Sequence, residues 1–272
     1  MLSQALDADA ALPLWHTIPR MRARFAATLV GGFIALAGLS VGAQSPHVVD
    51  LGHPIAATDP SWDGPPAFER VPSATFEKEG YAAGRVTTEE HFGTHVDAPA
   101  HFSKDGWTVD RIPVERLYRP AVRVDVSAKA ARDHDYRVTK EDLTAFEARY
   151  GRIPEGSVVL IATGWDRYWP DRVQYMGEKD GVKHFPGLSV EADAYLARDR
   201  RVAGIGIDTP SIDYGPSTAF EAHRVSLPLN VYHIENAAHL TTLPPTGFIV
   251  IVAPMNIAGG SGGPARVFAL LK

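Results

Sequence analysis

Residues 91–101 read His91-Phe92-Gly93-Thr94-His95-Val96-Asp97-Ala98-Pro99-Ala100-His101 and concentrate three imidazoles and one carboxylate, as no other segment of the 272-residue chain does. Imidazole nitrogen and carboxylate oxygen are ligands that Zn²⁺, Mn²⁺ and Fe²⁺ accept. Three protein ligands leave a further position for water, and an open position is typical of catalytic metal sites. A lone histidine is more often an ordinary surface or core residue, but this clustering favours a catalytic metal centre.

Geometry requires this stretch to bend. In a straight strand, at about 3.3 Å per residue, His91 and Asp97 would lie roughly 20 Å apart and could not share an ion. In a helix His91 and His95 would be neighbours, but Asp97 would point elsewhere. Gly93 permits the torsions of a tight turn, and Pro99 restricts the backbone that follows. We therefore expect a ligand-bearing turn with a rigid exit.

The pattern His-x-Gly-Thr-His-x-Asp-x-Pro-x-His resembles the signature of the metal-dependent cyclase family, which includes bacterial kynurenine formamidases and isatin hydrolases. The resemblance implies that His91, His95 and Asp97 bind metal and that His101 is the general acid and base. It also implies a β/β/α fold, hydrolysis of small aromatic or cyclic amides and lactones, and a homodimer or homotetramer. Two further runs share the resemblance, Val49-Asp50-Leu51-Gly52-His53-Pro54 and Asp208-Thr209-Pro210-Ser211-Ile212-Asp213.

A second element lies downstream, in the run from residue 223 to residue 235. His223 and Glu235 are spaced as the distal His and Glu of the formamidase branch, which implies a second metal site bridged by Asp97. Isatin hydrolases carry a glutamine at the position of Glu235, so the ligand set resembles that of the formamidases. Without the resemblance the pair would be unremarkable, and His233 and His239 are alternatives for the histidine.

These features predict a metal-dependent hydrolase that opens a C–N amide bond of a small aromatic substrate, either an aryl formamide or a cyclic amide. One or two divalent ions, Zn or Mn, would activate water, while His101 moves the proton. A lactone hydrolase or cyclase with the same site is an alternative. Trp62, in a loop, is the best candidate for contact with the substrate. Further aromatic candidates are Trp107, Trp165, Tyr168, Trp169 and Phe185.

Other functions compete with this interpretation. His95, Asp97 and His223 match the two-histidine, one-carboxylate set of non-haem Fe(II) oxygenases. Those enzymes usually have all-β folds, which the helical segments here argue against. A non-catalytic exported metal-binding protein is also compatible with the ligands. Ser261 in Gly259-Gly260-Ser261-Gly262-Gly263 matches G-x-S-x-G between a strand and an expected helix, but no acid or histidine follows it, so we assign it to a glycine loop near the site.

The N-terminus has the pattern of a secretory signal peptide. Arginines precede an apolar run that ends in small residues: Arg20, Arg22, Arg24, Phe25–Ala43 and Val41-Gly42-Ala43. We expect residues 1–43 to be a leader cleaved after Ala43, with translation starting at Met1 or at Met21. A membrane anchor is the alternative, but the run contains glycines and is short for the roughly 20 residues of a span. The predicted location is periplasmic or secreted, in a bacterium.

Residues 44–272 have the size of one domain with its own core. The absence of cysteine excludes disulfides, thiolate zinc sites and a cysteine nucleophile. The full chain has 27 basic and 32 acidic residues, and loss of three arginines and two aspartates with the leader leaves 24 and 30, a formal charge of −6. No basic block suggests nucleic acid or an anionic membrane as a partner, and we expect a small-molecule substrate.

Helix and strand patterns alternate in the second half of the chain. Helices are predicted over residues 139–151 and 189–200, and apolar strands over 157–163, 202–208 and 248–254. Earlier strands, at 85–90 and 121–127, are separated by loops instead. The chain is therefore expected to form a single α/β domain with a β-rich N-terminal half.

Overall fold

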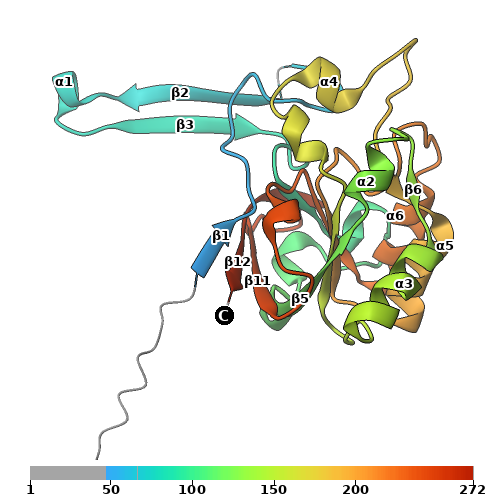
Figure 1. Cartoon of the computed structure of the whole chain (residues 1–272). Helices are drawn as coiled ribbons and strands as arrows, with labels where there is room; N and C mark the ends of the chain where they lie inside the picture. Colours follow the sequence, from blue (N-terminus) through green and yellow to red (C-terminus); the bar gives the residue numbers. More distant parts are fainter. Residues whose placement is uncertain (1–46, 66, 272) are drawn as a thin grey trace, which may run out of the picture. The chain divides into compact units, whose positions relative to one another are not determined.

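The computed structural model describes residues 47–65 and 67–271, so the predicted leader lies outside the described residues. Its central element is an eight-stranded mixed sheet (Figure 1). The order across the sheet is β1 (His47–Asp50), β12 (Gly262–Leu271), β11 (Phe248–Pro254), β5 (Tyr118–Asp125), β7 (Val158–Ala162), β9 (Gly204–Ile207), β10 (Tyr232–Glu235) and β4 (His95–Asp97). Because β12 also pairs with β4, the sheet closes into a barrel.

The four strands β5, β7, β9 and β10 run parallel, and both of their faces are covered. On β7, Val158 and Leu160 point into the barrel, where they pack with Val250 and Val267 of β11 and β12. Val159, between them, faces a second core formed with the helices. A strand that is buried on both faces needs a continuous apolar run, which is why residues 157–163 show no alternation.

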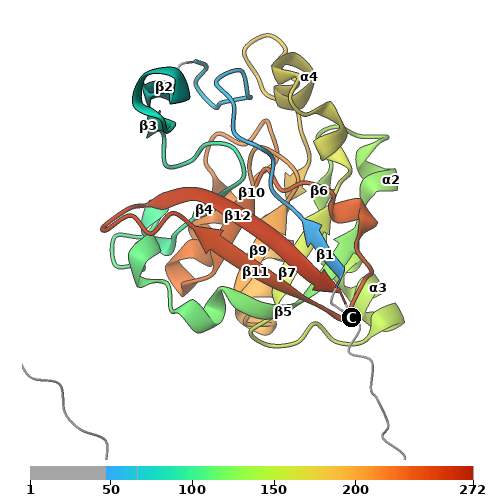
Figure 2. The same ribbon diagram turned by 90° about the vertical axis from the view of Figure 1, so that its left-hand side faces the viewer.

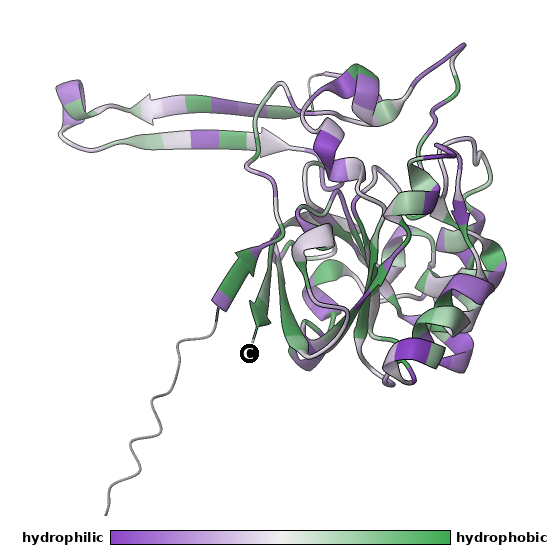
Figure 3. Ribbon diagram, viewed as in Figure 1, coloured by the Kyte–Doolittle hydropathy of each residue, from purple (hydrophilic) through white to green (hydrophobic). Residues whose placement is uncertain are grey.

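Helices cover the outer face of the parallel strands, as Figure 1 shows for α3, α5 and α6. Figure 3 shows apolar residues along the sheet and a mixture of polar and apolar residues on these helices. The helices are α2 (Ser127–Ala130), α3 (Lys140–Tyr150), α4 (Arg172–Met176), α5 (Val190–Ala194), which continues as a π-helix over Tyr195–Asp199, and α6 (Glu221–Ser226). Short 3₁₀ segments are Pro99–His101, Val109–Arg111, Val114–Arg116, Trp165–Tyr168, Leu227–Leu229 and Leu240–Thr242.

Local sequence signals set the ends of α3. The hydroxyl of Thr139 accepts a hydrogen bond from the backbone N–H of Asp142 at 3.3 Å, and the Asp142 carboxylate accepts one from the Thr139 N–H at 2.9 Å. This reciprocal capping box satisfies two N–H groups that the first turn leaves free. The helix ends before Gly151, whose φ of +92° a side chain would disfavour.

Most of the predicted elements are confirmed, with shifts at their ends. The strand predicted over 248–254 coincides with β11, whereas the one predicted over 121–127 begins earlier, at Tyr118. The helix expected after Ser261 is wrong. Residues 262–271 form β12, which runs beside β11 and β1 in Figure 2. Ladder pairing on both edges of β12 outweighs the helix propensity of its alanines and leucines.

A long hairpin projects away from the sheet (Figure 1) and consists of β2 (Phe68–Ala74) and β3 (Ala83–Thr88), with α1 (Phe76–Glu79) at its tip. We call residues 68–88 the arm. A further two-stranded sheet pairs β6 (Arg137–Val138) with β8 (Gly187–Leu188). Within residues 47–65 and 67–271, no helix combines the length and apolar character that a membrane crossing requires.

Candidate active site

The stretch 91–101 forms the predicted turn. Gly93 has a φ of +62°, and the chain then enters β4 for only three residues before Pro99 opens a 3₁₀ segment. Thr94 fixes the turn, because its hydroxyl donates to the carbonyl of Asn236 at 2.7 Å and accepts from the N–H of His53 at 2.9 Å. The turn brings Nδ1 of His91 within 2.6 Å of the Asp97 carboxylate.

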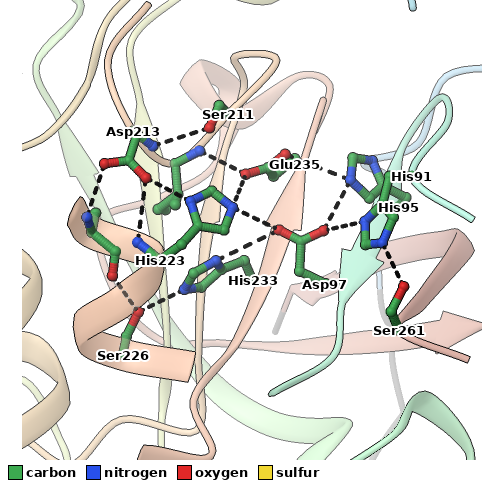
Figure 4. Close-up of polar contacts among 12 residues, drawn as sticks. His91, His95, Asp97, Ser211, Asp213, His223, Ser226, His233, Glu235 and Ser261 are labelled. Carbon is green, nitrogen blue, oxygen red and sulfur yellow. Dashed lines mark hydrogen bonds and ion pairs between the residues drawn. The ribbon is translucent and has the colours of Figure 1, made fainter. Parts of the chain in front are cut away.

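Pairing of β4 with β10 brings the distal residues to the same place. His95 lies opposite Glu235, and Asp97 lies opposite His233. Residues directly opposite one another in a sheet share a face, as do alternate residues of one strand. These four side chains therefore project together, and His223 reaches the same cluster from α6 (Figure 4).

Asp97 lies at the centre of the cluster. Its Oδ1 is 2.6 Å from Nδ1 of His91 and 3.2 Å from Nε2 of His95. Its Oδ2 is 3.2 Å from Nε2 of His223 and 3.6 Å from Nδ1 of His233. Each carboxylate oxygen thus faces a different pair of imidazoles.

The two carboxylate oxygens of Glu235 also face different imidazoles. Its Oε2 lies 3.5 Å from Nε2 of His95, and its Oε1 lies 3.3 Å from Nε2 of His223. Oε1 also accepts a hydrogen bond from the backbone N–H of Ile212 at 2.7 Å, which holds the carboxylate in place. The residues named from the sequence as metal ligands are therefore brought together, and His233 joins them.

Outer hydrogen bonds orient the imidazole rings. Nδ1 of His95 donates to the carbonyl of Gly93 at 3.0 Å, and Nδ1 of His223 donates to the carboxylate of Asp213 at 2.6 Å. A ring nitrogen that donates outward leaves the other nitrogen to present its lone pair inward, which is how metal-binding histidines are held. In both residues the inward nitrogen is Nε2.

His91 is held in the same manner by Ser261. The Ser261 hydroxyl donates to Glu90 at 2.5 Å and lies 2.9 Å from Nε2 of His91, from which it accepts. Nδ1 of His91 then faces Asp97. Ser261 is therefore next to the site, as expected of the glycine loop.

Gly262, paired with Asp97 across β12 and β4, allows this close packing. A Cβ on Gly262 would lie 2.5 Å from the carbonyl oxygen of Val96 and 2.6 Å from Cε1 of His91.

The cluster favours positive charge. Burial opposes ionisation, yet hydrogen bonds from the surrounding histidines hold the pKa of Asp97 well below its usual range. Burial likewise opposes a charge on His95, but the negative charges of Asp97 and Glu235 beside it raise its pKa to about 9. Asp213, Asp97 and Glu235 together raise the pKa of His223 well above its usual value, despite its burial. A divalent ion would supply this charge in place of protons.

The residues present fit such an ion. Nε2 of His95 and Nδ1 of His233 are buried and have no hydrogen-bond partner in the part of the chain that the structure describes. Each faces carboxylate oxygen. Unpaired acceptors buried against one another are costly, and a cation between them removes that cost.

His101 lies at the edge of the cluster. Its ring stacks on that of His91, with centroids 3.9 Å apart and planes inclined by 28°. His101 as a whole residue is exposed, but its imidazole ring packs against the rings of His91 and Phe102. The loss of water around the ring lowers its pKa to about 4. The imidazole is therefore neutral at neutral pH and can accept a proton. His239 does not join the cluster, since its side chain is 62% exposed and lies near Asp166.

A cavity of about 400 Å³ opens onto the cluster. Trp62 lines it, whereas the five other aromatic residues proposed from the sequence are absent from its described lining. Trp165 and Phe185 instead pack in a small buried cluster behind Trp62. The aromatic lining residues that sequence reasoning missed are Phe102, Tyr175 and Phe220.

The closed mixed sheet and its buried histidine-carboxylate cluster define a metal-dependent enzyme of α/β architecture. The chain belongs to the cyclase family, because the family model described as "Putative cyclase" matches residues 49–214. The parallel strands and the helices packed on them differ from the all-β fold expected of a non-haem oxygenase.

Similar proteins agree with this assignment. The chain is 31% identical over 257 residues to an isatin hydrolase of Roseibium aggregatum, covering 87% of this chain and 97% of the relative. It is 26% identical over 222 residues to a kynurenine formamidase of Salinibacter ruber, covering 80% and 95%. Among solved structures, isatin hydrolase A from Ralstonia solanacearum has a TM-score of 0.79 at 33% identity, covering 83% of this chain and 92% of the other. The protein is a metal-dependent hydrolase.

Proposed function

We propose that the protein hydrolyses the C–N amide bond of a small aromatic compound, either a cyclic amide or an aryl formamide. The observation that carries this proposal is that one cavity joins the histidine-carboxylate cluster to a group of aromatic rings. Relatives named isatin hydrolase and kynurenine formamidase act on substrates of these two kinds. An aromatic lactone is the second candidate, because the same cavity and cluster would serve it.

We assign the metal ligands to His91, His95, Asp97, His223 and Glu235, with Zn or Mn as the ion. The division of both carboxylates between two groups of imidazoles supports two ions rather than one. When bound, such an ion lowers the pKa of a water molecule to about 7 and polarises a carbonyl group.

His101 is assigned as the general acid and base. Its neutral imidazole at the cavity accepts the proton of the attacking water and returns it to the nitrogen that leaves, so that water and amide give a carboxylic acid and an amine. The stacking on His91 holds the ring beside the cluster. Trp62 is assigned to the substrate ring, because it lines the cavity with Phe220, 5.9 Å away between centroids.

We further propose that the protein is a homodimer or homotetramer and that the arm forms the contact. A two-stranded hairpin is at best marginally stable alone. The arm nevertheless exposes Val71, Phe76, Tyr81 and Val86, with Phe76 69% exposed. At its base Phe68 stacks on Phe92, with centroids 6.0 Å apart, so the arm is anchored at the end next to the site.

Export is proposed from the sequence alone. The arginines before Phe25 and the small residues before Gln44 support a leader over residues 1–43 and a mature domain over residues 44–272, in the periplasm or secreted.

The substrate class is tested with N-formylkynurenine, isatin, an aromatic lactone and a simple ester, each with and without chelator. We expect one of the amides to be hydrolysed fastest, and the chelator to lower its rate at least about tenfold, with recovery on adding Zn²⁺ or Mn²⁺. Chelator already saturated with Zn²⁺ is the control. Bound iron without any hydrolysis would favour the oxygenase, and tightly bound metal without turnover would favour the binding protein.

The role of His101 is tested by His101→Ala. Loss of a general acid and base should lower kcat by about 10²–10⁴-fold while the bound metal, measured by mass spectrometry, stays unchanged. His239→Ala, at an exposed histidine outside the cluster, is the matched control and should keep full activity. If His101→Ala loses metal but keeps its rate per bound ion, the residue is a ligand instead.

The arm is tested by Phe76→Ser combined with Tyr81→Ser. Removing the exposed rings should shift the mass measured by light scattering from an oligomer to a monomer, because the apolar contact area is lost. Val114→Ser, which changes a residue 77% exposed outside the arm, should leave the mass unchanged. A wild-type protein that is monomeric at all concentrations contradicts the proposal.

Export is tested by expressing the full chain in a bacterial host and sequencing the N-terminus of the recovered protein. We expect it to begin at Gln44, and Ala43→Phe to accumulate the precursor because cleavage sites require small residues. The same mature N-terminus is expected when translation starts at Met21. A cell-retained protein that keeps residues before Gln44 would disprove the leader.

A further inference from the structure

His233 is a buried histidine that the site assignment has not used. It lies on β10, is fully buried, and is placed opposite Asp97 by the register of β10 and β4. It is also two residues before Glu235, so the two side chains lie on the same face of the strand. His233 is not among the residues that line the cavity.

Hydrogen bonds fix which nitrogen of His233 is free. Nε2 lies 2.7 Å from the hydroxyl of Ser226, and that hydroxyl donates its hydrogen to the carbonyl of Ala222 at 3.2 Å. The hydroxyl therefore accepts from Nε2–H of His233. Nδ1 of His233 therefore keeps its lone pair, as Nε2 does in His95 and His223.

That lone pair points into the cluster (Figure 4). Nδ1 of His233 is 3.6 Å from Oδ2 of Asp97 and has no hydrogen-bond partner among the described residues. Four potential ligand atoms, one each from Asp97, His223, His233 and Glu235, lie within 4.8 Å of one another. An imidazole lone pair and a carboxylate oxygen that face each other away from water repel unless a cation lies between them.

We propose that Nδ1 of His233 is a metal ligand and that, with His223, Asp97 and Glu235, it encloses an inner ion. This inference rests on the proposed metal dependence and makes the two ion positions unequal. All four inner ligands are buried, and four protein ligands are typical of closed sites. Asp97, His223 and Glu235 also line the cavity, so the inner position is closed on the side of His233. The outer position lies beside His91, which is only half-buried, and beside His101, and it keeps room for water.

The difference between the two positions gives the proposal a readout other than activity. An ion held by four buried side chains exchanges slowly, whereas an ion at the open position is removed by chelator. We therefore expect wild-type protein loaded with Zn²⁺ to keep one ion through a brief chelator treatment and gel filtration.

The test compares Zn²⁺ binding of the wild type with that of His233→Ala, by metal analysis and by competition titration. We expect His233→Ala to lose the retained ion, with its affinity lowered by roughly 100-fold or more, since loss of an outer partner alone typically costs about 10–100-fold. Ser226→Ala, which keeps the ligand but removes its anchor, should give that smaller loss. His239→Ala should bind as the wild type does.

Equal stoichiometry and affinity in the wild type and His233→Ala would overturn the proposal. If hydrolysis remains chelator-sensitive in that case, only the inner-ligand assignment fails and the proposed function stands. A wild type that binds no divalent ion overturns both. Circular dichroism checks the fold of each variant. If His233→Ala does not fold, His233→Asn replaces it in the same titration, where unchanged binding again counts against the proposal.

Discussion

The negative charge of Asp97, buried at the seam between β4 and β10, is the constraint on which the centre of this molecule depends. A buried carboxylate costs several kcal/mol unless it is paired and hydrogen-bonded. Here it is surrounded by four imidazoles, and each of its oxygens faces two of them. Because β4 also joins β10 to β12, the strand that closes the barrel is the strand that carries Asp97 and His95. The pairing of β4 with its two neighbours therefore both closes the sheet and assembles the site.

The imidazoles are oriented by residues that lie far from the turn in sequence. Asp213 holds His223, Ser226 holds His233, and Ser261 holds His91 across 170 residues. These partners come from a loop, a helix and the glycine segment before β12. A ligand set of this kind is positioned by the whole domain, and the similarity to relatives also extends over most of the chain.

Local patterns in the sequence predicted many of the secondary-structure elements and the turn that carries the ligands. The spacing of His91, His95 and Asp97 around Gly93 implied a turn, and the pattern beginning at Thr139 predicted the start of α3. What could not be read locally is pairing between distant strands. The register that sets His233 opposite Asp97 depends on β4 and β10, which are separated by more than a hundred residues, although the position of His233 two residues before Glu235 was a usable signal. The segment after Ser261 was mistaken for a helix for the same reason, because its partners β11, β1 and β4 lie elsewhere in the chain.

Gly262 has no side chain to take part in the reaction, yet the site depends on it, because it packs directly against Val96 and His91. Its bare Cα lets β12 approach Val96 and the ring of His91 at distances that no Cβ could share. Any side chain at this position would have to displace the Val96 backbone or the ring of His91. The site therefore depends on space at Gly262 as well as on the chemistry of its ligands.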